Sequence, residues 1–150
     1  MWARTWFCGL ALLLLSGCTQ PTVNLEIEKS QSGTDFVITT AGVNGLLALR
    51  VMDEKSTNTL WALNLNYFPE GRITYGSIPR NFTAKNGQKS SAEQLIPTLR
   101  KKPEPLPTNA TLRVEITAQY DRSMAPSATT FYLSLQTDAK GNVSMPGATH

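Results

Sequence analysis

Residues 112–120 have the sequence LRVEITAQY, and this stretch decides the fold class. Every second residue is apolar or aromatic, and the residues between them are charged or polar. The apolar positions are Leu112, Val114, Ile116, Ala118 and Tyr120. Successive side chains of a β-strand point to opposite faces, so this period of two predicts a strand with one buried and one solvated face.

The same period recurs along the chain, and turn residues separate the repeats. Strands are expected at 23–28, 35–40, 46–52, 59–67, 72–78, 112–120, 130–137 and 143–145. The segment Pro69-Glu70-Gly71 suits a reverse turn, so 59–67 and 72–78 are expected to pair as a hairpin. A parallel sheet would need crossover helices. The pattern therefore predicts an all-β fold, an antiparallel Ig-like β-sandwich over residues 23–145, with a frayed tail at 146–150. It has about seven strands, and 143–145 as a short last strand brings the number to eight.

The alternation also predicts which side chains form the core. The expected core residues are Leu25, Ile27, Leu49, Val51, Trp61, Leu63, Leu65, Ile73, Leu112, Val114, Ile116, Phe131, Leu133 and Leu135.

One segment, residues 85–109, breaks the pattern because it is polar, basic and rich in proline. Proline cannot donate a ladder hydrogen bond, so this segment is expected to form one long surface connection. A capping box at Ser90–Glu93 predicts a short helix over 91–96 within it. The basic run Arg100-Lys101-Lys102 either contacts anionic headgroups or is a solvated loop. Partner contact is expected there and at Tyr67 and Phe68, which should be exposed at the hairpin tip.

The N-terminus predicts export. Arg4 and the α-amino group precede an uncharged run from Phe7 to Leu15, which has the length of a secretory signal and is too short to span a bilayer. The run ends in Leu15-Ser16-Gly17-Cys18. This tetrapeptide resembles the lipobox of bacterial lipoproteins. The alternative is an ordinary secretory signal with an incidental cysteine.

The lipobox resemblance implies a signal peptide at 1–17 and a lipidated Cys18 as the first mature residue. Residues 18–22 would then form a short tether, of which the four residues after Cys18 span at most about 13 Å. The protein would be held in the bacterial cell envelope by its lipid anchor, with the domain facing the periplasm. Thr19, rather than Asp, follows the cysteine, which favours the outer over the inner membrane.

A second resemblance concerns the segment from Leu106 to Val114, which is similar to the corner entering strand F of fibronectin type III-like domains. Leu112 stands where the corner tyrosine would be, so only the sandwich class follows from this resemblance. The Leu60-Trp61 strand, the segment from Tyr75 to Pro79 and the proline-rich run before a strand also look like small uncharacterised β-sandwich lipoproteins of bacterial envelopes. That family implies no chemistry.

The chain offers little material for catalysis. Its one histidine is the last residue, His150, and Cys8 lies in the expected signal peptide. We therefore expect no enzyme activity, no cofactor and no metal site. A formal charge of +3 is too small to suggest nucleic-acid binding. The expected function is non-enzymatic binding by an envelope lipoprotein, with an envelope protein as partner and no indicated oligomeric state. The alternative is a module that binds envelope glycan or peptidoglycan.

Overall fold

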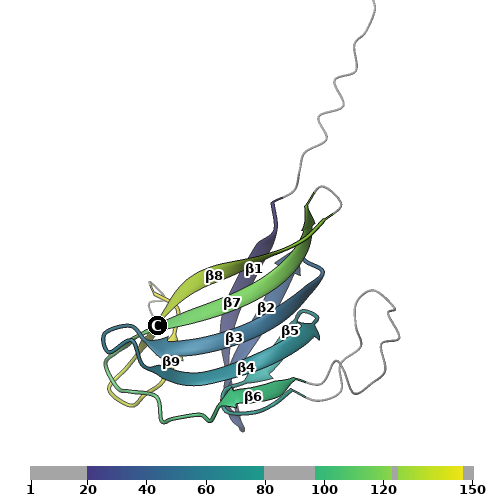
Figure 1. Cartoon of the computed structure of the whole chain (residues 1–150). Helices are drawn as coiled ribbons and strands as arrows, with labels where there is room; N and C mark the ends of the chain where they lie inside the picture. The colour runs from purple at the N-terminus through teal and green to yellow at the C-terminus, as the bar shows by residue number, and fades with distance from the viewer. Residues whose placement is uncertain (1–19, 80–96, 123–124, 147–150) are drawn as a thin grey trace, which may run out of the picture.

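Two antiparallel β-sheets pack face to face in the computed structural model, which describes residues 20–79, 97–122 and 125–146 (Figure 1). The smaller sheet has the order β1-β2-β5, formed by β1 (Thr22–Ser30), β2 (Gly33–Ala41) and β5 (Gly71–Thr74). The larger sheet has the order β6-β4-β3-β7-β8-β9. Its strands are β3 (Gly45–Asp53), β4 (Thr59–Phe68), β6 (Thr98–Lys101), β7 (Thr111–Arg122), β8 (Ala125–Thr137) and β9 (Val143–Ser144). The predicted all-β antiparallel sandwich is confirmed, with nine strands in the described residues.

The order of the central strands is that of immunoglobulin-like sandwiches. Strands β1, β2 and β5 take the places of A, B and E, and β3, β7 and β8 take those of C, F and G. Strand β4 lies beside β3 as strand C′ does beside C. Strand β7, in the position of F, begins at Thr111, within the segment that resembles the strand F corner.

Both sheets contribute to one core. Trp61 of β4 is fully buried. Its ring centroid lies 6.3 Å from that of Phe36 on β2 and 5.0 Å from that of Tyr75, the residue that directly follows β5. Of the predicted core residues, all are buried except Ile27, Phe131 and Leu133, which are only partly buried. These three lie on β1 and β8, near the margins of the two sheets, where fewer strands cover them.

The predicted hairpin between residues 59–67 and 72–78 is wrong. Strand β5 pairs with β2 in the smaller sheet, with Ile73 opposite Phe36, and not with β4. Strand β4 ends at Phe68, which still pairs with Leu46, and the φ angles of 48° and 65° at Asn66 and Tyr67 bend the strand just before that end. The following segment, Pro69–Glu70, therefore crosses between the sheets instead of turning back within one.

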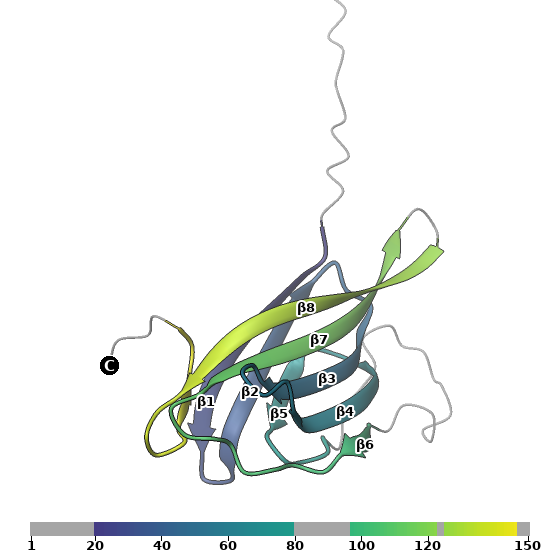
Figure 2. The same cartoon turned by 60° about the vertical axis from the view of Figure 1, so that its left-hand side comes forward.

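The predicted surface connection at 85–109 contains a strand. Residues Thr98–Lys101 form β6, which pairs with β4 and ends that edge of the larger sheet (Figure 2). The proline-rich residues after it are mostly exposed and follow the sandwich margin. Backbone hydrogen bonds tie them down: Glu104 N–H donates to the Leu60 carbonyl at 2.9 Å, and Tyr75 Oη donates to the Glu104 carbonyl at 2.8 Å. The predicted helix at 91–96 lies outside the described residues.

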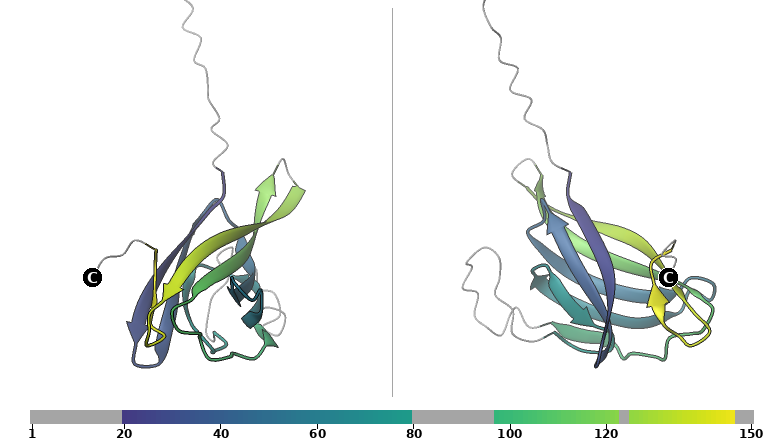
Figure 3. Two further views of the ribbon diagram at one scale, coloured as in Figure 1. Left: turned by 90° about the vertical axis from the view of Figure 1, so that its left-hand side faces the viewer. Right: turned by 180° about the vertical axis from the view of Figure 1, so that it is seen from behind.

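Strands β7 and β8 form the longest hairpin. Their pairing extends from Thr111 opposite Gln136 to Arg122 opposite Ala125, so both strands are longer than the expected 112–120 and 130–137. Figure 3 shows this hairpin twisting beyond the rest of the sandwich, at the same end as the start of β1. That end of the sandwich is therefore the one at which the described part of the chain begins.

Candidate functional site

One row of side chains crosses five strands of the larger sheet on its outer face. The pairing register places Lys101 of β6 opposite Ala62 of β4, Ala62 opposite Arg50 of β3, Arg50 opposite Glu115 of β7, and Glu115 opposite Tyr132 of β8. The neighbours of the three central residues along each strand are buried hydrophobic side chains. Because strand side chains alternate, the row must face away from the core.

The neighbouring row consists of small or uncharged side chains, and it makes the outer face concave. Asn64, Ala48, Thr117 and Thr130 are aligned across β4, β3, β7 and β8. The short side chains beside the long ones of the first row leave a hollow of about 520 Å³, which we call the outer-face hollow. Its lining residues are Ala48, Leu49, Arg50, Thr59, Ala62, Arg100, Lys101, Glu115, Thr117, Thr130 and Tyr132. The volume is within the range of small-molecule sites.

Glu115 organises the charges of this face. Its side chain is 9% exposed, and the Arg50 guanidinium donates to Oε2 from Nε at 2.7 Å and also from Nη2. Arg113 Nε lies 3.1 Å from Oε1 of the same carboxylate. One carboxylate thus compensates two guanidinium groups, and the group of three keeps a net positive charge. A carboxylate with both oxygens facing guanidiniums is suited to positioning these cations.

Tyr132 is the most exposed large hydrophobic side chain of the described residues, at 67%. The Arg113 guanidinium carbon lies over its ring, 5.9 Å from the centroid, which is within cation–π range. In the neighbouring row, the hydroxyl groups of Thr117 and Thr130 form a hydrogen bond, with 3.0 Å between their oxygens. The hollow therefore combines an aromatic ring and hydroxyl groups with its cations.

A β-bulge brings two consecutive basic residues of β6 to the hollow. Leu99 pairs with Leu63 and Lys101 pairs with Ala62, so Arg100 is the extra residue between two paired positions. Such a bulge interrupts strict alternation. As a result Arg100 and Lys101 both line the hollow. Lys101 Nζ lies 2.7 Å from Glu104 Oε1, whereas no carboxylate of the described residues pairs with Arg100.

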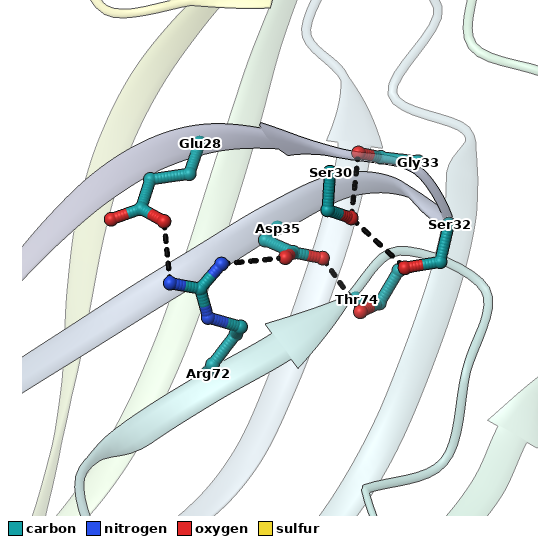
Figure 4. A network of polar contacts seen from close by, with 7 residues as sticks. All are labelled: Glu28, Ser30, Ser32, Gly33, Asp35, Arg72 and Thr74. Carbon is teal, nitrogen blue, oxygen red and sulfur yellow. Dashed lines mark hydrogen bonds and ion pairs between the residues drawn. The ribbon is translucent and has the colours of Figure 1, made fainter.

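The smaller sheet carries a different polar network on its outer face (Figure 4). Arg72 of β5 donates from Nη1 to Asp35 of β2 at 2.9 Å and from Nη2 to Glu28 of β1 at 2.5 Å. The Thr74 hydroxyl donates to the other Asp35 oxygen at 2.6 Å. The Thr74 bond, followed by Arg72, lowers the pKa of Asp35, which is 2% exposed. This network links all three strands of the sheet, so its evident role is structural.

The structure separates the residues predicted as contact sites. Arg100 and Lys101 lie at the outer-face hollow, although in a strand and not in a loop. Lys102 is exposed just beyond β6. Tyr67 is 44% exposed at the crossover between the sheets, while Phe68 is 4% exposed and belongs to the core. The prediction that Phe68 is exposed is wrong, because the bend at Asn66 and Tyr67 turns it inward.

Sequence reasoning missed the residues that complete the site, namely Arg50, Glu115, Thr117, Thr130 and Tyr132. Two of them are conspicuous in the sequence: Arg50 is the only charged residue in the apolar run 46–52, and Glu115 lies among residues that favour β-strands. Their alignment depends on the order of β3, β7 and β8 in the sheet. Cys18 lies outside the described residues.

Comparison with protein-family models, with curated proteins and with solved structures found no match to this chain. Within the residues that the structure describes, no helix is long and apolar enough to cross a membrane. The same residues contain no group of three or more His, Cys, Asp or Glu side chains placed to hold a metal ion.

Proposed function

We propose that this protein is a lipid-anchored lipoprotein of the bacterial cell envelope that acts by binding a ligand on the outer face of its larger sheet. The anchor rests on the sequence Leu15-Ser16-Gly17-Cys18. Strand β1 begins at Thr22, so the sandwich would start within four residues of the lipidated Cys18. The end that carries the β7–β8 turn would then lie near the headgroups.

The outer-face hollow is the observation that supports binding. Its charged residues come from β3, β6 and β7, and ion pairs hold Arg50 to Glu115 and Lys101 to Glu104. Arginine and lysine side chains keep their charge over the physiological pH range, which suits recognition of an anion. A rigid sheet positions such a site more accurately than loops do.

The anchor and the binding face can be tested separately. Cys18→Ser should release the protein from membranes, whereas Cys8→Ser should leave it membrane-bound, and the intact mass of the extracted chain should equal a chain starting at Cys18 plus acyl groups. A soluble product that begins after residue 18 would disprove anchoring.

For the binding face, a photoreactive residue in place of Thr130 should form covalent adducts with the bound ligand in the native envelope. The same residue at Thr39, an exposed position of β2 in the smaller sheet, is the matched control. Adducts at Thr39 alone would exclude the outer face of the larger sheet as the contact surface.

A second candidate function is protein docking along β8, and one feature of this strand favours it. Among the described residues, β9 pairs only with Gln136 and Thr137 of β8, so the rest of that edge has no strand partner. Strand β8 contains no Lys, Arg, Asp or Glu, the residues that commonly protect exposed edges from pairing. Ala128→Lys would place a charge there and should abolish protein adducts if this edge is the docking site.

A further inference from the structure

We propose that the outer-face hollow binds a glycan that carries carboxylate groups. The cations would hold the carboxylate, and the Tyr132 ring would lie against a sugar ring. This inference deepens the proposed function, because it rests on the outer face being the recognition surface.

The charge balance of the hollow selects an anion. Four cationic side chains, Arg50, Arg100, Lys101 and Arg113, lie in or beside it, and two carboxylates, Glu115 and Glu104, pair with them. Arg100 pairs with neither carboxylate and with no other acidic side chain of the described residues. The site therefore has cationic groups left over for a ligand, and Arg100 is the most available of them.

The geometry of the cations suits an oxyanion such as a carboxylate. A guanidinium presents parallel N–H groups that match the two oxygens of a carboxylate. Arg50 uses Nε and Nη2 on Glu115, which fixes the plane of its guanidinium and leaves Nη1 for a ligand. Lys101 is similarly restrained by Glu104. Restraint before binding reduces the conformational entropy that the ligand must overcome.

The uncharged part of the hollow fits a sugar. Tyr132 offers an exposed ring, and Arg113 packed over it restrains that ring. The Thr117 and Thr130 hydroxyls can each donate and accept hydrogen bonds, as the hydroxyls of a sugar require. The short side chains of Ala48 and Ala62 leave room above the sheet for a sugar ring.

Binding of the full-length protein, extracted from membranes in detergent, to purified peptidoglycan sacculi tests this inference. The second sample is the same sacculi with their carboxylates amidated, and the third is vesicles of anionic phospholipid. We expect cosedimentation with native sacculi, loss of about tenfold in affinity on amidation, and weakening with added salt because exposed charge pairs are screened. Because acyl chains insert into any bilayer, uncharged phospholipid vesicles are the reference. Stronger binding to anionic than to uncharged vesicles, without binding to sacculi, would overturn the inference in favour of a membrane surface.

Two substitutions at exposed side chains examine the site itself. Arg100→Gln should weaken binding about threefold, as expected for one exposed ion pair, and Tyr132→Ala about fivefold through loss of ring contact. Lys55→Gln, in the turn after β3, removes the same charge at an exposed position that does not line the hollow, and it is the control. Equal affinities for Arg100→Gln, Tyr132→Ala and the Lys55→Gln control would refute the inference.

The outcomes also separate this inference from the proposed function. The sacculi assay needs only purified protein and so does not depend on the anchor. If the Cys18→Ser test fails, the protein is purified from the soluble fraction and its binding to sacculi still tests the inference. If Thr130 forms adducts only with protein and sacculi do not bind, the glycan inference fails while the outer face stays the binding surface.

Discussion

Asp35→Asn tests the polar network of the smaller sheet, because it keeps the shape of the side chain and removes its charge. Asp35 is 2% exposed and accepts hydrogen bonds from Thr74 Oγ1 at 2.6 Å and Arg72 Nη1 at 2.9 Å. An asparagine has one acceptor oxygen, and its amide NH₂ would face one of these donors. The substitution therefore either places two donors opposite each other at Arg72 or requires the Thr74 hydroxyl to accept, and in both cases the hydrogen bonds to a charged oxygen are lost.

The expected loss of stability follows from these two bonds. A hydrogen bond to a charged group contributes about 1.5–3 kcal/mol, and the Arg72 bond lies at the lower end because its side chain is 51% exposed. We expect Asp35→Asn to reduce the free energy of unfolding by about 2–4 kcal/mol. For a domain of this size that lowers Tm by about 10 °C. The matched control is Glu26→Gln, which removes an exposed carboxylate from β1 in the same sheet.

The pH dependence of stability is a second, independent test of the Asp35 network. The Thr74 hydrogen bond and then Arg72 lower the pKa of Asp35 in the folded state, below the value of about 3.9 expected when unfolded. Its stabilising contribution is therefore fully present above about pH 4 and is lost as the pH falls through the lower, folded-state pKa. The Tm difference between Asp35→Asn and the unchanged protein should be constant near pH 7 and should shrink below about pH 4. A difference under 1 °C at pH 7, or one that does not shrink in acid, would refute the reasoning.

Three further substitutions probe packing, with urea midpoints as the measurement. Leu112→Ala, at a fully buried position of β7, should destabilise the fold by about 2–5 kcal/mol. Leu133→Ala, at a partly buried position of β8, should cost about half as much. A larger effect at Leu133 than at Leu112 would contradict the described core. Gly45→Ala would place a Cβ 2.9 Å from the Tyr67 Cα, a backbone atom, so the β3–β4 pairing must shift at a cost of about 1–3 kcal/mol; an unchanged midpoint would mean that the end of β4 adapts freely.

Particular elements show how far sequence patterns reach in this fold. The alternation in 112–120 predicted a strand with the correct inward face, and Leu112, Val114 and Ile116 are all fully buried. The segment Pro69-Glu70-Gly71 misled, because the same turn residues suit a hairpin and a crossover between sheets. The positive φ angles at Asn66 and Tyr67 that favour the crossover are not visible in the residue types before them.

The candidate site was likewise predictable from the sequence only in part. A basic run at residues 100–102 was visible in the sequence and predicted contact. Arg50 and Glu115, which also line the hollow, are 50 and 15 positions away from Arg100 along the chain. The pairing of β4 with β6, and of β3 with β4 and β7, aligns them with Lys101. Arg100 itself lines the hollow because it is the bulged residue of β6, between Leu99 and Lys101, which pair with Leu63 and Ala62.

The sequence by itself determined the fold class and the inward face of most strands, because side-chain alternation along a strand is a local property that each segment carries on its own. It also contains the motif around Cys18 on which the proposed anchor rests. Only the tertiary structure decided which strands are neighbours and in what register they pair. That choice depends on how all the strands bury one shared core, and it alone assembles Lys101, Ala62, Arg50, Glu115 and Tyr132 into a single row.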